Sequence, residues 1–365
     1  MHVVICGGGV IGACTAYFLA RRGVDVTVVE RVEVASSASG KAGGFLARDW
    51  CAGSPLDALA RRSFALHASL YKELGDWSYQ RVSSYSGLIA PQGDRHRRTA
   101  SKLGWLSDGV IIGAQLSTTE TTAMVNPRAF SLGMMRAAER HGATVRHGEV
   151  TGLSRSGDPI AGVDVDGETI AADAVVIAMG PWSLRAAQWL SLPLVYGLQS
   201  PSLVYDTAKD VPPEALFLDY QQESGSAVTV EVFPRADGST HVCAFGSQPP
   251  LPINPADVKP DPAAIERLQT LCEHLSPAFR PERIMARQAC FRPVTQDGLP
   301  LIGRVPGSVG AYIATGHSVW GILNAPATGE ALAELVADGS AETTDLTPFD
   351  PARLRPLDPT SIRMA

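Results

Sequence analysis

The sequence predicts an α/β fold joined to a second domain that is rich in antiparallel β-strands. Three observations support this prediction. The first 23 residues contain an apolar run of strand length, a glycine-rich turn and an apolar helix; short strands broken by prolines dominate from about residue 190; and a strand, a glycine turn and a helix follow near the C-terminus. A chain of 365 residues is long enough for about two domains.

The first element is the apolar stretch 3–6, which enters a G-x-G-x-x-G pattern, Gly7-Gly8-Gly9-Val10-Ile11-Gly12. Gly7 permits a tight turn, Gly9 lets the backbone approach a pyrophosphate, and Gly12 allows close packing of helix on strand. Val10 and Ile11 open a helix whose free N–H groups and dipole favour an anion. The alternative is a glycine-rich turn that binds nothing.

A second strand is predicted over residues 24–29, and it ends in Glu30 and Arg31. Glu30 lies about 20 residues beyond the glycines, where a carboxylate can accept hydrogen bonds from ribose hydroxyls. We therefore predict a dinucleotide site, with Glu30 and Arg31 as candidate contacts. FAD and NAD share this fingerprint, so these residues alone leave the cofactor open.

Residues 35–45 are small and polar, with little to bury, and suit a backbone that wraps an extended cofactor. The alternative is a flexible linker. The candidate cofactor contacts in this segment are Ser37, Ser39, Lys41, Ala42, Gly43, Gly44 and Phe45.

Further elements follow from hydrophobic periodicity and end signals. Helices are predicted over 56–74, after Ser54-Pro55, and over about 127–140, with Asn126 as its cap, Pro127 at its first position and Gly142 at its end. Predicted strands cover 85–90, 145–150, 160–165, 169–171 and 174–178, and Asp166-Gly167 marks a hairpin. The last of these strands is apolar on both faces, as a buried parallel strand is.

The sheet-rich segment follows, with strands predicted over 198–205, 215–220, 227–233 and 241–245 and one clear helix over 262–275. A strand over 311–314, a glycine turn over 315–321 and a helix from about 325 to 337 then close the chain. The C-terminal part is therefore expected to complete the first domain.

The composition is that of an ordinary globular protein, with 45% hydrophobic residues, 19% charged residues and a formal net charge of −6. This charge gives no basis for binding nucleic acid, and the short cluster Arg95-His96-Arg97-Arg98 is interpreted as a solvated loop. The six cysteines show neither C-x-x-C pairs nor metal spacing, which predicts reduced thiols in a cytoplasm and no metal. Without a signal peptide or a membrane-length apolar run, we expect a soluble protein.

Together these segments resemble the D-amino-acid oxidase-like family of FAD-dependent oxidoreductases, which includes glycine oxidase and sarcosine oxidase. Two stretches are specific to that family and favour FAD over NAD: Arg292-Pro293…Asp297-Gly298-Leu299-Pro300, and Gly316-His317…Gly321…Ala325-Pro326-Ala327-Thr328-Gly329. The variant Ser39-Gly40-Lys41-Ala42-Gly43-Gly44-Phe45-Leu46, followed by Asp49-Trp50-Cys51, is more similar to a poorly characterised branch found in fungi, plants and bacteria.

The resemblance implies a glutathione-reductase-like, Rossmann-type FAD-binding domain and a sheet-rich substrate domain, with the isoalloxazine ring at their interface. We expect residues 1–80, 125–190 and 300–345 to form the first domain and residues 81–124 and 191–299 to form the second. Residues 346–365 would be a C-terminal tail, either a packed strap or partly disordered.

The candidate catalytic residues are Arg292, His317 and Trp320. Arg292, at the family's Arg-Pro position, would hold a substrate carboxylate bidentately; the alternative is a structural ion pair. His317 would lie near the flavin, or be a loop histidine with its own partner. The dipole of the last helix would stabilise negative charge on the reduced ring. Further candidate FAD contacts are Val150, Ala178, Gly180, Trp182, Gly316, Gly321 and Ile322. No base is assigned among Tyr205, Asp219 and Tyr220.

Cys290 raises the question of a covalent flavin. In the sarcosine oxidase branch a cysteine seven residues before the family's Asp carries the flavin, and Cys290 lies seven residues before Asp297. Its neighbours differ from that branch, and small buried cysteines are common. We expect non-covalent FAD, with a covalent link at Cys290 as the alternative.

The expected function is oxidation of the C–N bond of an amino acid or of a secondary amine with a carboxylate, by hydride transfer to flavin and hydrolysis of the imine. The partners would be that small molecule and dioxygen or another electron acceptor. Two alternatives stay open: a low-turnover flavoprotein that acts as a binding or trafficking factor, and a hydroxy-acid oxidase, because Arg292 suits either substrate.

Overall fold

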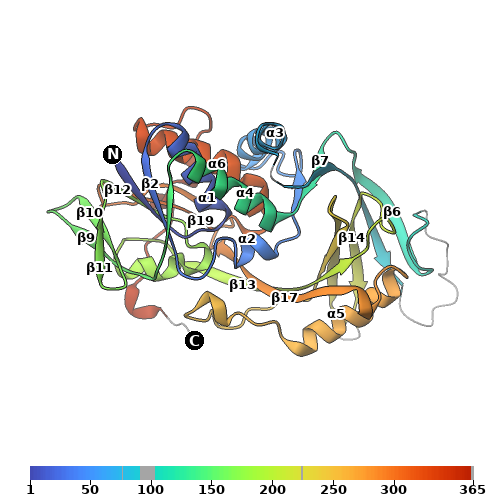
Figure 1. The fold of residues 1–365 in the computed structure, drawn as a ribbon. Coiled ribbons are helices and arrows are strands. Elements are labelled where there is room, and N and C mark those ends of the chain that lie inside the picture. The colour runs from blue at the N-terminus through green and yellow to red at the C-terminus, as the bar shows by residue number, and fades with distance from the viewer. Residues whose placement is uncertain (76, 91–102, 223–224, 363–365) are drawn as a thin grey trace.

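The computed structural model describes residues 1–75, 77–90, 103–222 and 225–362. Within these ranges a six-stranded sheet forms the centre of one half of the molecule (Figure 1). Its order is β18 (Leu301–Arg304), β19 (Ala311–Thr315), β12 (Ala174–Ile177), β1 (His2–Cys6), β2 (Asp25–Glu30) and β8 (Thr144–His147). All neighbours are parallel except β18 and β19. Strands from both ends of the chain therefore build one sheet.

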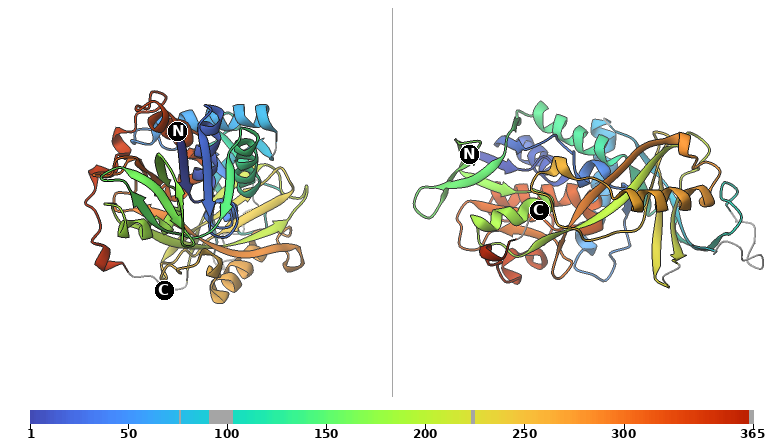
Figure 2. Two further views of the ribbon diagram at one scale, coloured as in Figure 1. Left: turned by 60° about the vertical axis from the view of Figure 1, so that its left-hand side comes forward. Right: turned by 90° about the horizontal axis from the view of Figure 1, so that it is seen from below.

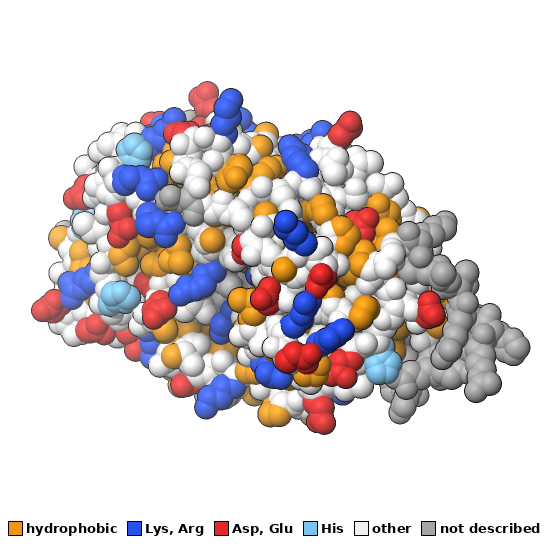
Figure 3. Space-filling model, turned by 45° about the vertical axis from the view of Figure 1, so that its right-hand side comes forward, with side chains coloured by type: hydrophobic (Ala, Val, Ile, Leu, Met, Phe, Trp, Pro, Cys, Tyr) orange, Lys and Arg blue, Asp and Glu red, His pale blue; other side chains and the backbone are white. Residues whose placement is uncertain are grey.

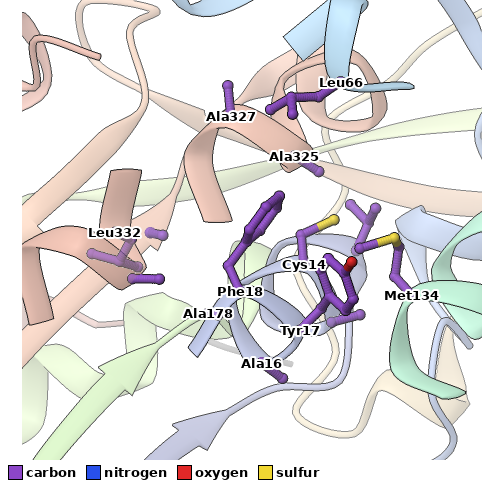
Figure 4. Close-up of a cluster of buried hydrophobic side chains, with 14 of the residues drawn as sticks. Cys14, Ala16, Tyr17, Phe18, Leu66, Met134, Ala178, Ala325, Ala327 and Leu332 are labelled. Atoms are coloured by element: carbon purple, nitrogen blue, oxygen red, sulfur yellow. The ribbon is translucent and has the colours of Figure 1, made fainter. Parts of the chain in front are cut away.

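One face of this sheet is covered by α1 (Val10–Arg21), α3 (Asp57–Leu74), α4 (Pro127–Arg140) and α6 (Gly321–Ala337). Figure 4 shows Tyr17 and Phe18 of α1 among side chains from the other helices, such as Met134 of α4 and Ala325 of α6. Gly329 allows α6 to cross α1 closely, because a Cβ there would lie 2.6 Å from the carbonyl carbon of Cys14. The C-terminal glycine motif thus packs on the first helix.

The other face carries a small antiparallel sheet of β9 (Val150–Arg155), β10 (Ile160–Val165) and β11 (Glu168–Ala171), together with the 3-10 segment Gly180–Gln188. The predicted hairpin is confirmed, since Asp166 and Gly167 both have positive φ, 51° and 87°. The predicted strand 145–150 is wrong: it is split between β8 and β9. At Gly148, where the chain passes between the two sheets, a Cβ would lie 2.5 Å from Val165 Cγ1.

The second half of the molecule is built on a seven-stranded sheet, as far as the chain is described. Its order is β17 (Ile284–Thr295), β13 (Val195–Asp206), β16 (Ser239–Cys243), β15 (Ala227–Pro234), β14 (Glu214–Gln221), β5 (Ser83–Ile89) and β6 (Val110–Ser117). All pairs are antiparallel except β14 and β5. Helix α5 (Pro262–Leu275) packs on the apolar face, over Leu203, Leu218 and Val242.

A third sheet of β3 (Phe45–Ala47), β7 (Thr122–Val125) and β4 (Tyr79–Arg81) lies between the two halves (Figure 2). The short helix α2 (Ala38–Lys41) precedes it. The predicted fold class, a Rossmann-type α/β unit with a sheet-rich second unit, is confirmed.

Several predicted helix ends are also confirmed. Helix α5 has the predicted limits, and Asn126 caps α4 by accepting a hydrogen bond from the Ala129 N–H at 3.1 Å. Helix α3 begins later than expected, at Asp57. The Ser54 hydroxyl instead accepts a hydrogen bond from the Leu56 N–H at 3.2 Å, in the turn before the helix.

Helix α6 begins at Gly321 rather than near residue 325 as predicted, although it contains Pro326. A proline inside a helix has no N–H to donate to the carbonyl four residues earlier, here that of Ile322. The Nε2–H of His67 donates to that oxygen at 2.9 Å and to the Leu323 oxygen at 3.2 Å. Burial lowers the pKa of His67 to about 4, so the ring is neutral. His67 thus satisfies the carbonyl that Pro326 leaves free.

The C-terminal tail is a packed strap as far as residue 362, and Figure 2 shows it along the outside of the molecule. Phe349 is 1% exposed, and the Leu357 N–H donates to the Leu192 oxygen at 2.8 Å. Arg353 donates from Nε to Oδ2 of Asp297 at 2.7 Å and from Nη2 to Oδ1 at 3.1 Å. Burial raises the pKa of Asp297, but the bonds from Arg353, the Leu299 N–H and Thr295 outweigh this and leave it below its ordinary value.

The cluster Arg95-His96-Arg97-Arg98 lies outside the described residues. On the face in Figure 3, Lys and Arg side chains are mixed with acidic ones. No helix in the described ranges combines the length and the hydropathy needed to cross a membrane. Nor do the described side chains form a group of three that could hold a metal ion.

We predict that Arg353→Ala lowers the free energy of unfolding by about 1–3 kcal/mol at neutral pH, because a charge-assisted pair is lost. Folding lowers the pKa of Asp297, so this contribution is present at neutral pH and is lost as the pH falls through the lowered pKa. Denaturant unfolding across pH measures the effect. Arg355→Ala, at an exposed position in the same tail, is the control and should change little. Equal effects of both substitutions would contradict the prediction.

Candidate functional site

A cavity of about 450 Å³ lies between the two main sheets. Turns at the carboxyl ends of the parallel strands line one side of it, among them Gly7, Glu30, Ala178 and Thr315. The seven-stranded sheet lines the other side. Ligands of open α/β sheets bind at the carboxyl ends of the strands, so the position is that of a binding site.

The glycine turn and Glu30 form one end of the cavity. Gly7 has φ of 111°, and at Gly12 a Cβ would lie 2.0 Å from the Gly7 oxygen. Gly12 therefore serves the turn and does not line the cavity. The Glu30 carboxylate accepts hydrogen bonds from the N–H of Gly8 at 2.7 Å and of Val32 at 2.9 Å, which fix its orientation at the end of β2.

The segment 35–45 is held in place and is not a flexible linker. The Ser39 hydroxyl accepts a hydrogen bond from the Val10 N–H at 2.8 Å, at the start of α1. Arg235, 8% exposed, donates to the oxygens of Ala42 at 2.8 Å and Gly43 at 3.2 Å. Burial lowers the pKa of Arg235 to about 10, although Asp237 opposes the shift, so its guanidinium stays charged.

The turn before α6 and the first residues of that helix form another wall, to which Trp320, Gly321 and Ile322 contribute. His317 is buried, and its Nε2 lies 3.1 Å from Thr328 Oγ1. Burial lowers the pKa of His317 to about 3, so the ring is neutral. His317, in the turn before α6, therefore has a partner on that helix and also borders the cavity. The free N–H groups at the start of α6 make this wall electropositive.

Side chains of one face of the seven-stranded sheet form the floor. Ser202 of β13, Cys243 of β16, Glu231 of β15 and Phe217 of β14 are successive cross-strand neighbours and all line the cavity. The Cys243 thiol donates to Glu231 Oε2 at 3.3 Å. Burial raises the pKa of Glu231, although Cys243 and Arg292 lower it in part.

Arg292 lies at the β17 edge of this floor. Its Nε is buried and lacks a hydrogen-bond partner, and no acidic side chain in the described part of the chain forms an ion pair with it. The alternative of a structural ion pair therefore has no acidic partner among the described residues. An unpaired guanidinium in a cavity favours an anionic ligand.

Cys290 precedes Arg292 on the same strand and lines the cavity. Burial raises the pKa of its thiol to about 11, although Lys41 and Arg292 oppose the shift. A thiol of this kind carries little thiolate near neutral pH and is a poor nucleophile. Its environment is that of an unreactive buried cysteine.

Nearly all of the candidate site residues from the sequence meet at this cavity. Gly12 and Gly316 do not line it; at Gly316, with φ of 81°, a Cβ would lie 2.7 Å from Thr295 Cγ2. Those that line it are Gly7, Gly9, Val10, Ile11, Glu30, Arg31, Ser37, Ser39, Lys41, Ala42, Gly43, Gly44, Phe45, Val150, Ala178, Gly180, Trp182, Cys290, Arg292, His317, Trp320, Gly321 and Ile322.

Sequence reasoning missed Arg235, Glu231 and the aromatic residues around them. Trp50 lies 5.1 Å from Phe45 and 4.8 Å from Phe217 between ring centroids. A signal for Glu231 was present, because it is a single acidic residue in the apolar strand Ala227–Pro234. Arg235, in a turn between strands, had no such signal.

This fold and this cavity define an FAD-dependent oxidoreductase with a dinucleotide-binding unit and a sheet-rich unit. The chain belongs to the family described as DAO, FAD dependent oxidoreductase, which matches residues 2–335. The glycine and C-terminal motifs that suggested the resemblance lie within this range, so the predicted family and the predicted cofactor are confirmed.

Three similar proteins match along nearly their whole length. Glycine oxidase of Pseudomonas aeruginosa is 29% identical, with 96% of this chain and 98% of that protein covered. YurR of Bacillus subtilis, named only as an oxidoreductase, is 27% identical, with 96% and 98% covered. The crystal structure of glycine oxidase from Geobacillus kaustophilus has a TM-score of 0.79 at 27% identity, with 96% of this chain and 98% of that chain covered.

We predict that FAD is bound without a covalent link to Cys290, because its thiol is protonated. After denaturation and ultrafiltration, all the yellow colour should pass the filter, and Cys290→Ser should bind as much flavin as the wild type. Flavin that stays with the denatured wild type but not with Cys290→Ser would contradict this prediction.

Proposed function

We propose that this FAD-dependent oxidoreductase oxidises the C–N bond of an amino acid, or of a secondary amine that bears a carboxylate. The observation that supports this most is Arg292, a guanidinium without an acidic partner in the described part of the chain, on the same cavity as the glycine turn and the start of α6. A substrate carboxylate would supply the missing partner. The names of the glycine oxidases among the similar proteins agree with an amino-acid substrate.

The residues of the cavity fit FAD. Gly9 presents no Cβ at the start of α1, where free N–H groups favour a pyrophosphate, and Glu30 offers oriented carboxylate oxygens for ribose hydroxyls. We assign the segment 37–45 and the start of α6 to the flavin end. In this proposal residues 1–80, 125–190 and 300–345 hold FAD, and residues 81–124 and 191–299 hold the substrate.

Bound FAD supplies the acceptor for a hydride from the carbon that bears the amine. Arg292 binds the carboxylate and orients that carbon. The N-terminal dipole of α6 stabilises negative charge at this end of the cavity. Trp320 and Trp50, 6.4 Å apart between centroids, exclude water from the substrate. His317 is neutral and positions the turn before α6 through Thr328. Water then hydrolyses the imine product.

The test is an anaerobic screen of the holoenzyme with amino acids, N-alkyl amino acids and hydroxy acids, in which loss of the flavin colour reports reduction. The proposal expects reduction by an amino compound. Reduction by hydroxy acids alone would replace it with hydroxy-acid oxidation. Full flavin occupancy without reduction by any compound would favour a binding factor. Peroxide formed in air then separates an oxidase from a dehydrogenase.

We predict that Arg292→Met raises the substrate concentration needed for half-maximal flavin reduction by about 100-fold, since a charged hydrogen-bonded pair is lost. Arg287→Met is the control, because Arg287 lies on the same strand, is exposed and does not line the cavity. Rapid-mixing reduction measurements give both values. The assignment fails if the two variants have the same effect.

We predict that Gly9→Ala weakens FAD binding by about 10-fold or more, because its methyl group would occupy the space where a pyrophosphate approaches the turn. The added Cβ would lie 3.0 Å from Ser39 Oγ, a tight contact that a small shift of this side chain has to relieve. Gly104→Ala, with no atom within 4 Å of the new Cβ, is the control. Fluorescence titration of the apoproteins with FAD measures both, and wild-type affinity in Gly9→Ala would refute the prediction.

A further inference from the structure

Glu231 is a carboxylate on the cavity that the proposed chemistry does not use. Among the described residues, the one hydrogen bond found for its side chain comes from the Cys243 thiol, at 3.3 Å. A thiol is a weak donor. Burial raises the pKa of Glu231 above its ordinary value. A buried carboxylate that accepts a single weak hydrogen bond is poorly stabilised, so the binding of a cation there is favourable.

Aromatic rings frame Glu231. Phe217 is its direct cross-strand neighbour, and Phe233 lies two residues further along the same strand on the same face. Their ring centroids are 5.6 Å apart, and Trp50 lies 4.8 Å from Phe217. Phe233 is stacked against Phe45 at 5.5 Å and against His241 at 6.2 Å between centroids, so these rings give the Glu231 carboxylate an apolar surround.

Arg292 and Glu231 hold opposite charges at two places on one floor. Their strands, β17 and β15, are separated by β13 and β16, about 14 Å between strand axes, and the register places Glu231 four residues further along the sheet than Arg292. The two side chains line the same cavity and form no ion pair with each other. They are close enough for the charge of Arg292 to lower the pKa of Glu231 in part. Between them lie the small side chains of Ser200, Ser202 and Cys243. A short molecule with two opposite charges fits between them.

We infer that Glu231, framed by Phe217 and Phe233, binds the positively charged nitrogen of the substrate while Arg292 binds its carboxylate. The substrate class is therefore a short zwitterion. This inference rests on the proposed function, because it takes Arg292 as the carboxylate site.

Glu231 also receives a proton. The nitrogen needs its lone pair before the neighbouring C–H bond can release a hydride. The N–H proton of the bound ammonium passes to a carboxylate oxygen of Glu231, which leaves a neutral amine and a neutral carboxylic acid. Burial favours the neutral pair over two charges. Glu231 thus allows the enzyme to bind the charged form of the substrate, which dominates at neutral pH.

The test uses two probes that differ in one atom. Glycine betaine and 3,3-dimethylbutanoate have the same shape and the same carboxylate, but betaine has a cationic nitrogen where the other has carbon. Neither has a nitrogen lone pair, so the readout is binding to the holoenzyme at about pH 8, followed by the change in flavin absorbance. We expect the wild type to bind betaine about 10-fold or more tightly than 3,3-dimethylbutanoate.

Glu231→Gln should remove that preference, with betaine bound about 10-fold or more weakly and 3,3-dimethylbutanoate within about 2-fold of wild type. Asp219→Asn, the same change at an exposed position of the same sheet, should alter neither. The inference is overturned if the wild type shows no preference, if Glu231→Gln weakens both probes alike, or if neither probe binds. If Glu231→Gln does not bind flavin, the preference of the wild type for betaine over 3,3-dimethylbutanoate is the measurement that tests the inference.

Arg292→Met separates this inference from the proposed function. Loss of both probes in that variant supports the carboxylate site. Unchanged binding of both in Arg292→Met, with selective loss of betaine in Glu231→Gln, would keep the ammonium site and refute the carboxylate site.

Discussion

The buried guanidinium of Arg235 connects the two halves of the molecule. It leaves the seven-stranded sheet and donates to the carbonyl groups of Ala42 and Gly43, in the segment that follows the nucleotide turn. Ser39 of that segment bonds in turn to the start of α1. Because Arg235 is buried and its acceptors are partly buried, breaking these contacts would leave polar groups unsatisfied. The cavity keeps its shape because its two walls share these hydrogen bonds.

The same cavity carries its charges in separate places. The glycine turn and the start of α6 present N–H groups, Arg292 presents a cation, and Glu231 presents an anion next to aromatic rings. Each of these groups lacks a partner of opposite charge in a medium of low dielectric, which costs free energy. Ligands that pair with them therefore stabilise the folded protein. The sheet supplies the spacing, since alternate residues of four strands project the floor side chains to one side.

Local patterns predicted the fold well. The first strand, turn and helix, the Asn126 cap and the limits of α5 follow from residues close together in the chain, whose hydrogen bonds are local. The start of α6 was wrong because the partner of its free carbonyl, His67, lies 255 residues away. Glu231 and Arg235 were missed for a similar reason. The role of Glu231 depends on the strands beside its own, and that of Arg235 on carbonyl groups in a loop 192 and 193 residues away, and one sequence contains neither pairing.

Three buried histidines, His67, His241 and His317, are neutral rings, and the last two line the cavity. An unfolded chain protonates its histidines near pH 6.5, whereas His67 in the folded chain does so only near 4. Between these values the unfolded state binds more protons, so acidification costs stability. Two of the three rings, those of His67 and His317, bond to α6, whose first residues line the cavity. The stability lost on mild acidification is therefore partly stability of the region around α6 and of the cavity wall that this helix forms.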